Sequence, residues 1–310
     1  MIIQITEPQD YSEKALKIYQ SLGEVFFSSK PLKDAEILVI GLKYKIDKKW
    51  LEAMLKLKVI GWQGTGLNHI DVAAVKARGV KLISLRGRKG FLKNIPSTAE
   101  EAMALLLALV RNIPWSFDAV KGGSWGRMPW RGHQLYKKTI GLVGFGRLGR
   151  IMARYTRAFG MKVISFDPYV SEGLMKKNGA EKVSLEALLK RSDIVSLHAL
   201  LTDETHNLLK EKHFRMMKPT AVLVNTARGE LIAKGALEKA LKNKRIAGAS
   251  IDVMWDEHSD GRHLKNNPLV EYAKHHQNLI IVPHIGGATF EAMEETQDYI
   301  AELVKRYSKK

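Results

Sequence analysis

The chain has 310 residues, of which 45% are hydrophobic and 26% charged, so it is long enough for two domains with substantial cores. Lys and Arg outnumber Asp and Glu by 50 to 32, which gives a net charge of +18. The lack of cysteine excludes a disulfide framework and thiolate catalysis. The sequence contains no run of about 18 apolar residues, so we predict no membrane span. Because Met1 leads directly into an apolar strand pattern, we expect no signal peptide and a cytoplasmic protein.

The high positive charge permits two interpretations. One is nucleic-acid binding, and the other is a basic surface that attracts small anionic substrates. Lysines and arginines are spread over several predicted elements, and the only clusters, at 86–89 and 309–310, are short. We therefore expect no nucleic-acid partner.

The N-terminal part of the chain, up to residue 95, alternates strand patterns with helix patterns. Such alternation predicts a parallel sheet with helices packed on it. The predicted strands are 2–6, 37–40, 59–62 and 81–84, and the predicted helices are 12–22, 48–55 and 71–78. Ser12 is the expected N-cap of the first helix.

A domain boundary is predicted near 94–96. A long helix is expected to follow, capped by Ser97 or Thr98 and ending at Val110 or Asn112. Pro and Gly residues in the next segment predict a looping arm before the chain enters its central unit.

The strongest local pattern in the chain surrounds a glycine-rich turn. The apolar segment 138–143 predicts a buried strand, and apolar residues at helical spacing predict a helix over 150–159. Between them, residues 144–149 have the spacing G-x-G-x-x-G. A second strand is predicted at 162–166, and Asp167 follows it. This order is typical of a dinucleotide-binding βαβ unit.

Each glycine of this turn has its own expected role. Gly144 makes the tight turn, Gly146 lets the backbone approach a diphosphate, and Gly149 lets helix and strand pack closely. The amides at the helix N-terminus, at Arg147 and Leu148, are expected to face the phosphates. Asp167 is expected to bind the adenosine ribose hydroxyls and to repel a 2′-phosphate, so the cofactor NAD is favoured over NADP.

Further strands are predicted at 194–197, 221–225, 248–253 and 279–282. A final helix over 291–305 is expected to return to the first domain. The prediction is a two-domain α/β protein with two doubly wound parallel sheets and a cleft between the domains. The expected domains are 1–95 with 286–310, and 96–285.

Polar residues follow three of these strands. In a doubly wound sheet, ligands bind beyond the carboxyl ends of the strands, so these residues are candidates for catalysis. Arg228 follows one strand, Asp256 and Glu257 follow the next, and His284 follows the last. An imidazole near neutrality suits general acid–base work, and a guanidinium suits the binding of a carboxylate.

The chain resembles the D-isomer-specific 2-hydroxyacid dehydrogenases, a family that includes D-3-phosphoglycerate dehydrogenase. The resemblance runs in order through almost the whole chain. It is carried by Gly64-Thr65-Gly66, Asn94-Ile95-Pro96-Ser97-Thr98-Ala99-Glu100, the fingerprint at 141–149, Asn225-Thr226-Ala227-Arg228-Gly229, Asp252-Val253 with Glu257, and Pro283-His284-Ile285-Gly286-Gly287.

The resemblance implies a Rossmann-type cofactor domain, a flavodoxin-like substrate domain, and interconversion of a small D-2-hydroxy acid and its 2-oxo acid by hydride transfer. It implies that Arg228, Glu257 and His284 are catalytic. His284 would be the acid and base, Glu257 would orient the ring, and Arg228 would bind the substrate. The backbone of Gly64, Thr65 and Gly66 would bind the substrate carboxylate. The further cofactor-binding residues are Thr226, Ala227, Asp252, Gly286 and Gly287. Of these, the resemblance places Thr226, Asp252 and Gly286 on the nicotinamide side. A homodimer built on the helix from Thr98 to Asn112 and its arm is also implied.

Two points stay open. The family usually has Pro after the catalytic Glu, and here His258 stands there, so Asp256 competes with Glu257 as the partner of His284. The same family also includes corepressors that sense NAD(H) and recruit partners, which is the alternative function. The acids and histidines around 256–263 lack the spacing of a metal site, so none is expected.

Overall fold

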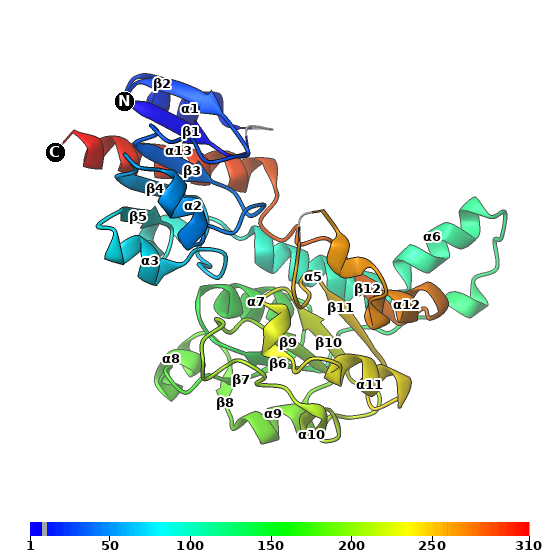
Figure 1. The fold of residues 1–310 in the computed structure, drawn as a ribbon. Helices are drawn as coiled ribbons and strands as arrows, with labels where there is room; N and C mark the ends of the chain where they lie inside the picture. The colour runs from blue at the N-terminus through cyan, green and yellow to red at the C-terminus, as the bar shows by residue number, and fades with distance from the viewer. Residues whose placement is uncertain (8–10, 259, 310) are drawn as a thin grey trace. The chain divides into compact units, whose positions relative to one another are not determined.

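The computed structural model describes residues 1–7, 11–258 and 260–309. The chain forms two compact units (Figure 1). Unit 1 consists of Met1–Ile95 and Ala288–Lys310, and unit 2 of Pro96–Gly287. The second crossing between units therefore follows Gly287, slightly later than the sequence suggested.

Unit 1 is built on a five-stranded parallel sheet with the order β2-β1-β3-β4-β5. Its strands are β1 (Ile2–Ile5), β2 (Glu24–Phe27), β3 (Ile37–Ile40), β4 (Val59–Trp62) and β5 (Lys81–Ser84). Four of them lie where the sequence predicted strands. The one exception, β2, was missed because it is an edge strand, mostly exposed and paired only with β1, so it lacks a buried apolar pattern.

Helices cover both faces of this sheet. They are α1 (Glu13–Gln20), α2 (Lys48–Ala53), α3 (Val72–Ala77), the short α4 (Lys89–Leu92) and α13 (Phe290–Ser308). The predicted Ser12 cap is present, because its hydroxyl accepts a hydrogen bond from the Ala15 amide at 3.3 Å. The C-terminal helix α13 packs against α1, β4 and β5.

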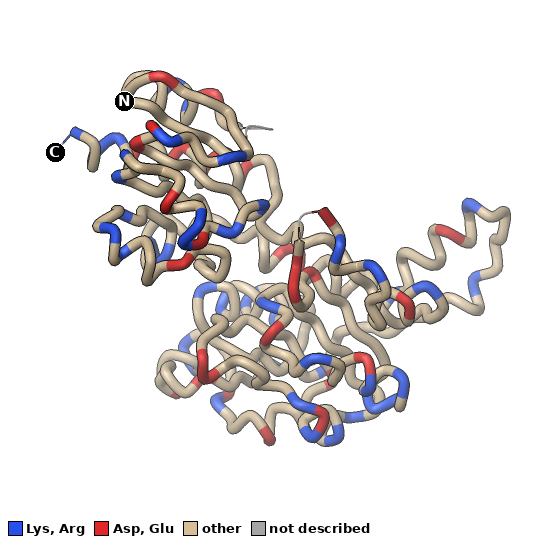
Figure 2. Tube along the Cα trace, viewed as in Figure 1, with Lys and Arg blue, Asp and Glu red and all other residues tan. Residues whose placement is uncertain are grey.

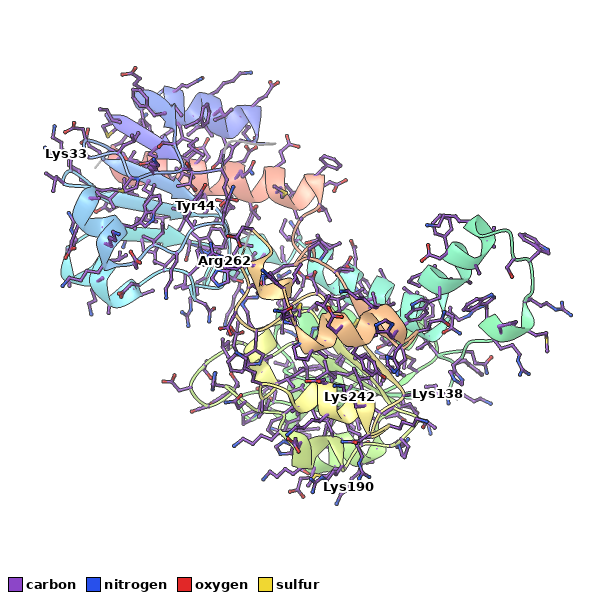
Figure 3. The ribbon with its side chains drawn as sticks, turned by 45° about the vertical axis from the view of Figure 1, so that its right-hand side comes forward. Lys33, Tyr44, Lys138, Lys190, Lys242 and Arg262 are labelled. Atoms are coloured by element: carbon purple, nitrogen blue, oxygen red, sulfur yellow. The ribbon has the colours of Figure 1, made fainter. Side chains whose placement is uncertain are left out.

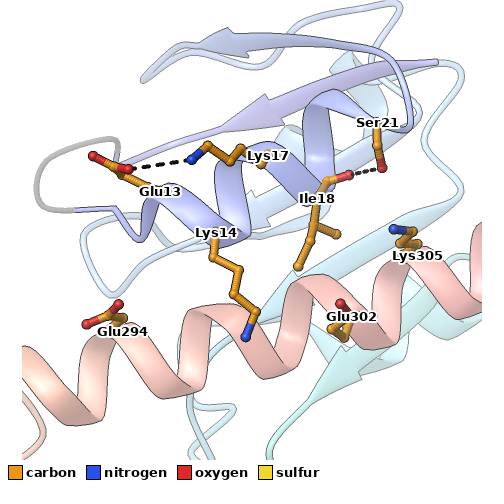
Figure 4. A pocket seen from close by; sticks show the side chains of 8 residues that line it. All are labelled: Glu13, Lys14, Lys17, Ile18, Ser21, Glu294, Glu302 and Lys305. Carbon is orange, nitrogen blue, oxygen red and sulfur yellow. Dashed lines mark hydrogen bonds and ion pairs between the residues drawn. The ribbon is translucent and has the colours of Figure 1, made fainter.

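An open hollow of about 670 Å³ lies between α1 and α13 (Figure 4). Six of its eight lining side chains are charged, three of each sign. Its lining residues are Glu13, Lys14, Lys17, Ile18, Ser21, Glu294, Glu302 and Lys305. Balanced charge around one Ile is typical of a solvated seam between two helices, so we do not consider it a functional site.

Unit 2 holds a seven-stranded parallel sheet with the order β12-β11-β10-β9-β6-β7-β8. Its strands are β6 (Thr139–Val143), β7 (Lys162–Phe166), β8 (Glu181–Lys182), β9 (Ile194–Leu197), β10 (Val222–Asn225), β11 (Gly248–Ile251) and β12 (Leu279–Ile281). The chain moves outward from β6 to β8 and then returns to the other side of β6. The strand order therefore reverses at β6, where an open α/β sheet binds ligands. The predicted doubly wound parallel sheets are confirmed.

Two apolar cores lie in unit 2. The helices α5 (Ser97–Val110) and α7 (Arg147–Ala158) contribute to one core, and α9 (Leu185–Arg191), α10 (Glu211–Phe214) and α11 (Ala236–Lys242) contribute to the other. Unit 2 also contains α8 (Glu172–Lys177) and α12 (Pro268–His275). The predicted cap of α5 is wrong: Ser97 is already helical and buried, Pro96 occupies the N-cap, and no side chain bonds there.

The arm after α5 is also more regular than the sequence suggested. Ile113–Lys121 forms helix α6, which projects from the rest of unit 2 (Figure 1). Pro114 does not mark a loop, as the sequence predicts, but lies in the first turn of α6, where a helix tolerates proline because the amide there has no helical partner.

Basic residues are distributed over both units and interspersed with acidic ones (Figure 2). In unit 2, for example, Lys138, Lys190 and Lys242 are exposed and come from three different segments (Figure 3). Within the described residues no single helix is long and apolar enough to cross a membrane. One pair of consecutive helical segments, 89–110 and 113–121, is together long and apolar enough, but the two segments are bent by 61° relative to each other.

Candidate functional site

The glycine-rich turn joins β6 to α7 at the point where the strand order reverses. Gly144 has a φ of 94°, and a Cβ there would lie 2.6 Å from the Ala199 amide nitrogen. A Cβ on Gly149 would lie 2.3 Å from the carbonyl oxygen of Gly144. Around Gly146, by contrast, no described atom lies within 4 Å of such a Cβ. The turn and its packing therefore require the first and third glycines, whereas the second borders open space that a diphosphate can occupy.

Asp167 is tied to this turn. Its Oδ2 accepts a hydrogen bond from the Phe145 amide at 2.8 Å, and its Oδ1 accepts one from the Tyr169 amide at 3.0 Å. Each carboxylate oxygen has a second acceptor site. The backbone thus fixes the carboxylate while leaving it able to accept a ribose hydroxyl.

The N-terminus of α7 lies beside the open space at Gly146. No side chain of the described residues caps this helix. Leu148 and Arg147 lie in its first turn, and both are partly buried. Burial lowers the pKa of the Arg147 guanidinium, which remains a cation at any physiological pH. A helix N-terminus of this kind suits an anionic ligand.

His198 follows β9 and was not singled out from the sequence. Its Nε2 lies 2.9 Å from the Ser196 hydroxyl, and burial lowers its pKa to about 4. It is therefore neutral at physiological pH. Its Cβ lies 3.9 Å from where a Gly149 Cβ would be, so it packs under the turn. The available signal was its position directly after a buried strand.

Arg228 lies in the loop after β10. The Asn225 side chain holds this loop, because its Nδ2 donates to the Arg228 carbonyl at 2.9 Å and its Oδ1 accepts from the Ala227 amide at 3.0 Å. A Cβ on Gly229 would lie 2.2 Å from the Met254 carbonyl carbon. The loop that carries Arg228 therefore packs directly on the loop after β11.

Glu257 and His284 form a hydrogen-bonded pair, although they come from the loops after different strands. The Nδ1 of His284 lies 2.6 Å from Oε2 of Glu257, and Oε1 of Glu257 accepts from the Met254 amide at 2.6 Å. Burial raises the pKa of Glu257, but the contacts with His284, the Met254 amide and the charge of Arg228 together hold it below its usual range. The carboxylate is thus ionised at neutral pH and engages Nδ1, which leaves Nε2 as the ring nitrogen available to a substrate.

Asp256 is oriented elsewhere. Its carboxylate forms an ion pair with the Lys234 ammonium at 2.8 Å. Its backbone has a φ of 54°, an uncommon conformation for a residue other than glycine. Of the two acids left open by the sequence, the structure pairs Glu257 with His284.

Asp252 fixes the backbone next to His284. This residue is 1% exposed, and its carboxylate accepts from the amides of Ile285 at 2.6 Å and Gly286 at 2.9 Å. Burial is the largest cause that raises the pKa of Asp252. A Cβ on Gly286 would lie 2.9 Å from Oδ2 of Asp252 and 3.2 Å from Cγ2 of Thr98, which explains the glycine. Asp252 therefore holds the His284 loop against the start of α5.

Thr226 supplies a test of whether a cofactor fits. It is 5% exposed, yet its hydroxyl has no hydrogen-bond partner among the described residues. A buried hydroxyl without a partner is costly, and a bound polar group relieves the cost. Gly287, the last residue of unit 2, has no described atom within 4 Å of a Cβ position. With the space at Gly146 and the oriented Asp167, these features are compatible with a dinucleotide.

In unit 1, the Gly64-Thr65-Gly66 loop follows β4. Trp62 braces it, because the indole Nε1 donates to the Gly66 carbonyl at 2.7 Å. A Cβ on Gly64 would lie 2.2 Å from the indole ring. The Leu85 amide also donates to the Gly64 carbonyl at 3.1 Å. Sequence reasoning named the loop but missed Trp62, whose signal was a large aromatic at the end of a buried strand before two glycines.

No group of three or more metal-ligating side chains occurs within residues 1–7, 11–258 and 260–309. His258 and His263 do lie near each other, but the Nδ1 of His263 accepts a hydrogen bond from the His258 amide at 3.0 Å.

Comparison with known proteins identifies the family. Residues 103–286 match the model of the D-isomer specific 2-hydroxyacid dehydrogenase NAD-binding domain. The chain is 35% identical to D-3-phosphoglycerate dehydrogenase of Methanocaldococcus jannaschii over 313 residues, which covers 98% of this chain and 57% of that protein. It is 36% identical to glyoxylate reductase of Thermococcus litoralis over 285 residues, 90% of this chain and 82% of the relative.

The fold is similar to that of a solved D-lactate dehydrogenase from Aquifex aeolicus in complex with NAD and lactic acid. The TM-score is 0.86 at 28% identity, with 100% of this chain and 96% of that one covered. The chain spans only 57% and 49% of the length of two of the phosphoglycerate dehydrogenases it matches. The expected cofactor, NAD, is confirmed by the match to the NAD-binding domain. The chain belongs to the D-isomer specific 2-hydroxyacid dehydrogenase family.

Proposed function

We propose that this protein is an NAD-dependent dehydrogenase that interconverts a small D-2-hydroxy acid and its 2-oxo acid. The observation that carries the proposal is the 2.6 Å contact between His284 and Glu257, with Arg228 on a loop that packs on Met254, three residues before Glu257. A cation for a carboxylate and an oriented imidazole for a hydroxyl proton are the two side-chain functions that this reaction needs. Family membership supports the same reaction.

His284 is the proposed acid and base. In reduction, its Nε2 donates a proton to the C2 oxygen of the oxo acid, and in oxidation it takes the hydroxyl proton. Glu257 is a positioning residue: it holds Nδ1 and favours the protonated ring. Arg228 binds the substrate carboxylate and polarises the C2 oxygen through its planar set of donors.

When bound, the cofactor would supply redox chemistry: NADH would be the source of the hydride for C2 in reduction, and NAD+ its acceptor in oxidation. The residues proposed to hold it lie in unit 2. Gly144, Gly146, Arg147, Leu148 and Gly149 bind the diphosphate, Asp167 binds the adenosine ribose, and Thr226, Ala227, Asp252, Gly286 and Gly287 line the nicotinamide side. The partnerless Thr226 hydroxyl supports this assignment.

Unit 1 is proposed to contribute backbone groups to the substrate. The amides of Gly64, Thr65 and Gly66 suit a carboxylate, and the Trp62 brace holds this loop in one conformation. The named relatives act on different acids, so the group on C2 is left to experiment. The loop after β3 carries Lys43 and Lys45, which add positive charge that a phosphorylated substrate could use.

The test is a spectrophotometric screen of NADH oxidation. The panel contains glyoxylate, pyruvate and the 2-oxo form of 3-phosphoglycerate, each with the protein as purified. We expect saturable turnover with at least one acid. The alternative is an NAD(H)-sensing binding protein of the corepressor type. That alternative predicts tight NADH binding and no turnover with any member of a broad 2-oxo acid panel, a result that would refute the enzymatic proposal.

We also propose a homodimer formed through α5 and the α6 arm. Ile113, Phe117 and Val120 are exposed at i, i+4 and i+7, which places an apolar stripe on one face of α6. Trp125 on the same arm is 88% exposed. An apolar surface of this kind is typical of an interface, and a second copy of the chain is the proposed partner.

Light scattering tests the dimer. It should give twice the 34.9 kDa chain mass for the parent protein, and the mass of a monomer for the double variant Phe117→Ser and Trp125→Ser. Leu55→Ser, also exposed but in unit 1, is the control.

A further inference from the structure

Two loops of unit 2 flank the glycine-rich turn on opposite sides. β7 and β9 are the two neighbours of β6 in the sheet, so the loops that follow them lie on either side of the turn (Figure 1). Tyr169 lies in the loop after β7, and Glu204 lies in the loop after β9. The Tyr169 hydroxyl donates a hydrogen bond to the Glu204 carboxylate. This bond connects the two loops across the Asp167 end of the dinucleotide site.

The loop that carries Glu204 is held by its own hydrogen bonds. Thr205 organises it, since its hydroxyl accepts from the Thr202 amide at 2.8 Å and donates to the Leu200 carbonyl at 2.6 Å. The His206 amide also donates to the Thr202 carbonyl at 2.8 Å. Glu204 is thus presented by an ordered turn.

The opposite loop connects directly to Asp167. The Tyr169 amide donates to Oδ1 of Asp167, and the Tyr169 hydroxyl donates to Glu204. One residue therefore links two carboxylates. The hydrogen bond to Glu204 is the largest of several causes that raise the pKa of Tyr169, and the charge of Asp167 contributes as well. Tyr169 is consequently a hydroxyl donor at neutral pH.

Each of these two loops also exposes a large side chain. Tyr169 is 78% exposed and Leu200 is 68% exposed, so each loop presents a large apolar side chain. Planar bases bind between apolar and aromatic side chains of this kind.

We propose that Glu204, positioned by Tyr169, is a second acidic determinant of cofactor choice beside Asp167. The proposal rests on the proposed placement of NAD, with the adenosine ribose at Asp167. The 2′-phosphate of NADP would then lie close to two carboxylates, those of Asp167 and Glu204, instead of one. The effect is needed because the chain carries a net charge of +18, which by itself attracts the more highly charged NADP. Local acids must offset that attraction if NAD is to be selected.

The test measures the binding of NADH and NADPH to the whole chain by nucleotide fluorescence, without turnover. Glu204→Gln keeps the shape and removes the charge. We expect it to tighten NADPH binding about fivefold and to leave NADH within about twofold, the size expected for exposed charges roughly 10 Å apart. Because salt screens exposed charges, the gain in NADPH affinity should shrink strongly in roughly 0.5 M salt, about ten times the ionic strength of the low-salt measurement.

Tyr169→Phe separates charge from position. It keeps both carboxylates and removes only the hydroxyl. The ratio of NADPH affinity to NADH affinity should therefore change less than in Glu204→Gln. Asp167→Ala should move it more. Glu211→Gln removes another exposed charge, from α10, where the carboxylate pairs with Lys239, and should leave the ratio unchanged.

The proposal is overturned if Glu204→Gln leaves the ratio unchanged. It is also overturned if that variant weakens both nucleotides equally at low and high salt, because this is the behaviour of a purely structural contact. If the unsubstituted protein binds neither nucleotide, the placement of NAD fails first and the proposed function fails with it.

Discussion

Unit 2 contains two candidate functional regions that are built in different ways. The glycine-rich turn after β6 offers its backbone, and all its parts lie within one continuous stretch from Gly144 to Asp167. The region around His284 offers side chains, and its parts come from three loops after β10, β11 and β12. The first is one local supersecondary unit. The second exists only because the sheet places three strand ends side by side.

This difference separates binding from chemistry. We expect changes in the glycine-rich turn to weaken NADH binding and to leave the proton transfer machinery intact. Changes around His284 should remove turnover and leave NADH binding intact. Four measurements test this separation, from the largest expected effect to the smallest.

The largest effect is expected for His284→Ala. Loss of a general acid costs roughly a hundredfold to ten-thousandfold in rate, and we expect about a thousandfold loss of kcat with the best 2-oxo acid. NADH affinity should stay within about twofold. His275→Ala, which removes an exposed histidine of α12, is the matched control and should behave as the parent. Retention of most turnover by His284→Ala would exclude it as the proton donor.

Arg228→Lys should lower kcat/KM about a hundredfold. The lysine keeps the positive charge but lacks the planar, bidentate donor set, and this loss corresponds to about 2.7 kcal/mol of transition-state binding. NADH affinity should change little. Arg245→Lys, at an exposed position of unit 2, should leave kcat/KM unchanged. Equal kinetics for the two variants would remove Arg228 from the mechanism.

The glycines test the other region. Gly146→Ala places a methyl group in open space, so the protein should keep its melting temperature and lose about tenfold in NADH affinity through the blocked diphosphate position. Gly149→Ala places a methyl 2.3 Å from the Gly144 carbonyl oxygen, so it should lower both stability and NADH affinity. The expected stability loss is about 1–3 kcal/mol, measured by denaturant unfolding.

This glycine pair can contradict the comparison directly. If Gly146→Ala binds NADH as well as the parent while its melting temperature is unchanged, the open space beside Gly146 is not the diphosphate site. If Gly149→Ala is as stable as the parent, the close contact with Gly144 does not constrain the turn.

The smallest effect is a shift in pH dependence in Glu257→Gln. Glu257 has a lowered pKa, so in the parent it is ionised from mildly acidic pH upward and stabilises the protonated ring of His284. Removing this charge favours the neutral ring. Reduction requires the protonated ring, so its rate should fall off at a pH about one unit lower than in the parent. Oxidation requires the neutral ring and should persist to lower pH by a similar amount.

The pH profile of kcat/KM in both directions provides the measurement. Asp256→Asn is the control. Because Asp256 pairs with Lys234, this variant should leave the pH profiles of reduction and oxidation unchanged. A shift in Asp256→Asn with none in Glu257→Gln would reverse the assignment of the two acids.

Much of the fold could be predicted from the sequence because its signals are local. Buried parallel strands such as β3 and β4 are short continuous apolar runs, and both lie where predicted. The glycine-rich turn was also predictable, because Gly144 is required by its positive φ and Gly149 by its contact with Gly144, five residues away. The edge strand β2 was missed, since an exposed edge needs no regular burial, and Pro114 was misread because a proline marks either a loop or the first turn of a helix.

The sequence by itself thus determined the α/β class, the dinucleotide-binding unit and the types of the three candidate catalytic residues. Only the tertiary structure decided which acid pairs with His284. Asp256 and Glu257 are adjacent and chemically alike, so no periodicity distinguishes them. The choice depends on a positive φ at Asp256, on Lys234 after β10 and on the Met254 amide that orients Glu257. These contacts bring together residues from separate strands, and a pairing of that kind is set by the order of the sheet rather than by any stretch of sequence.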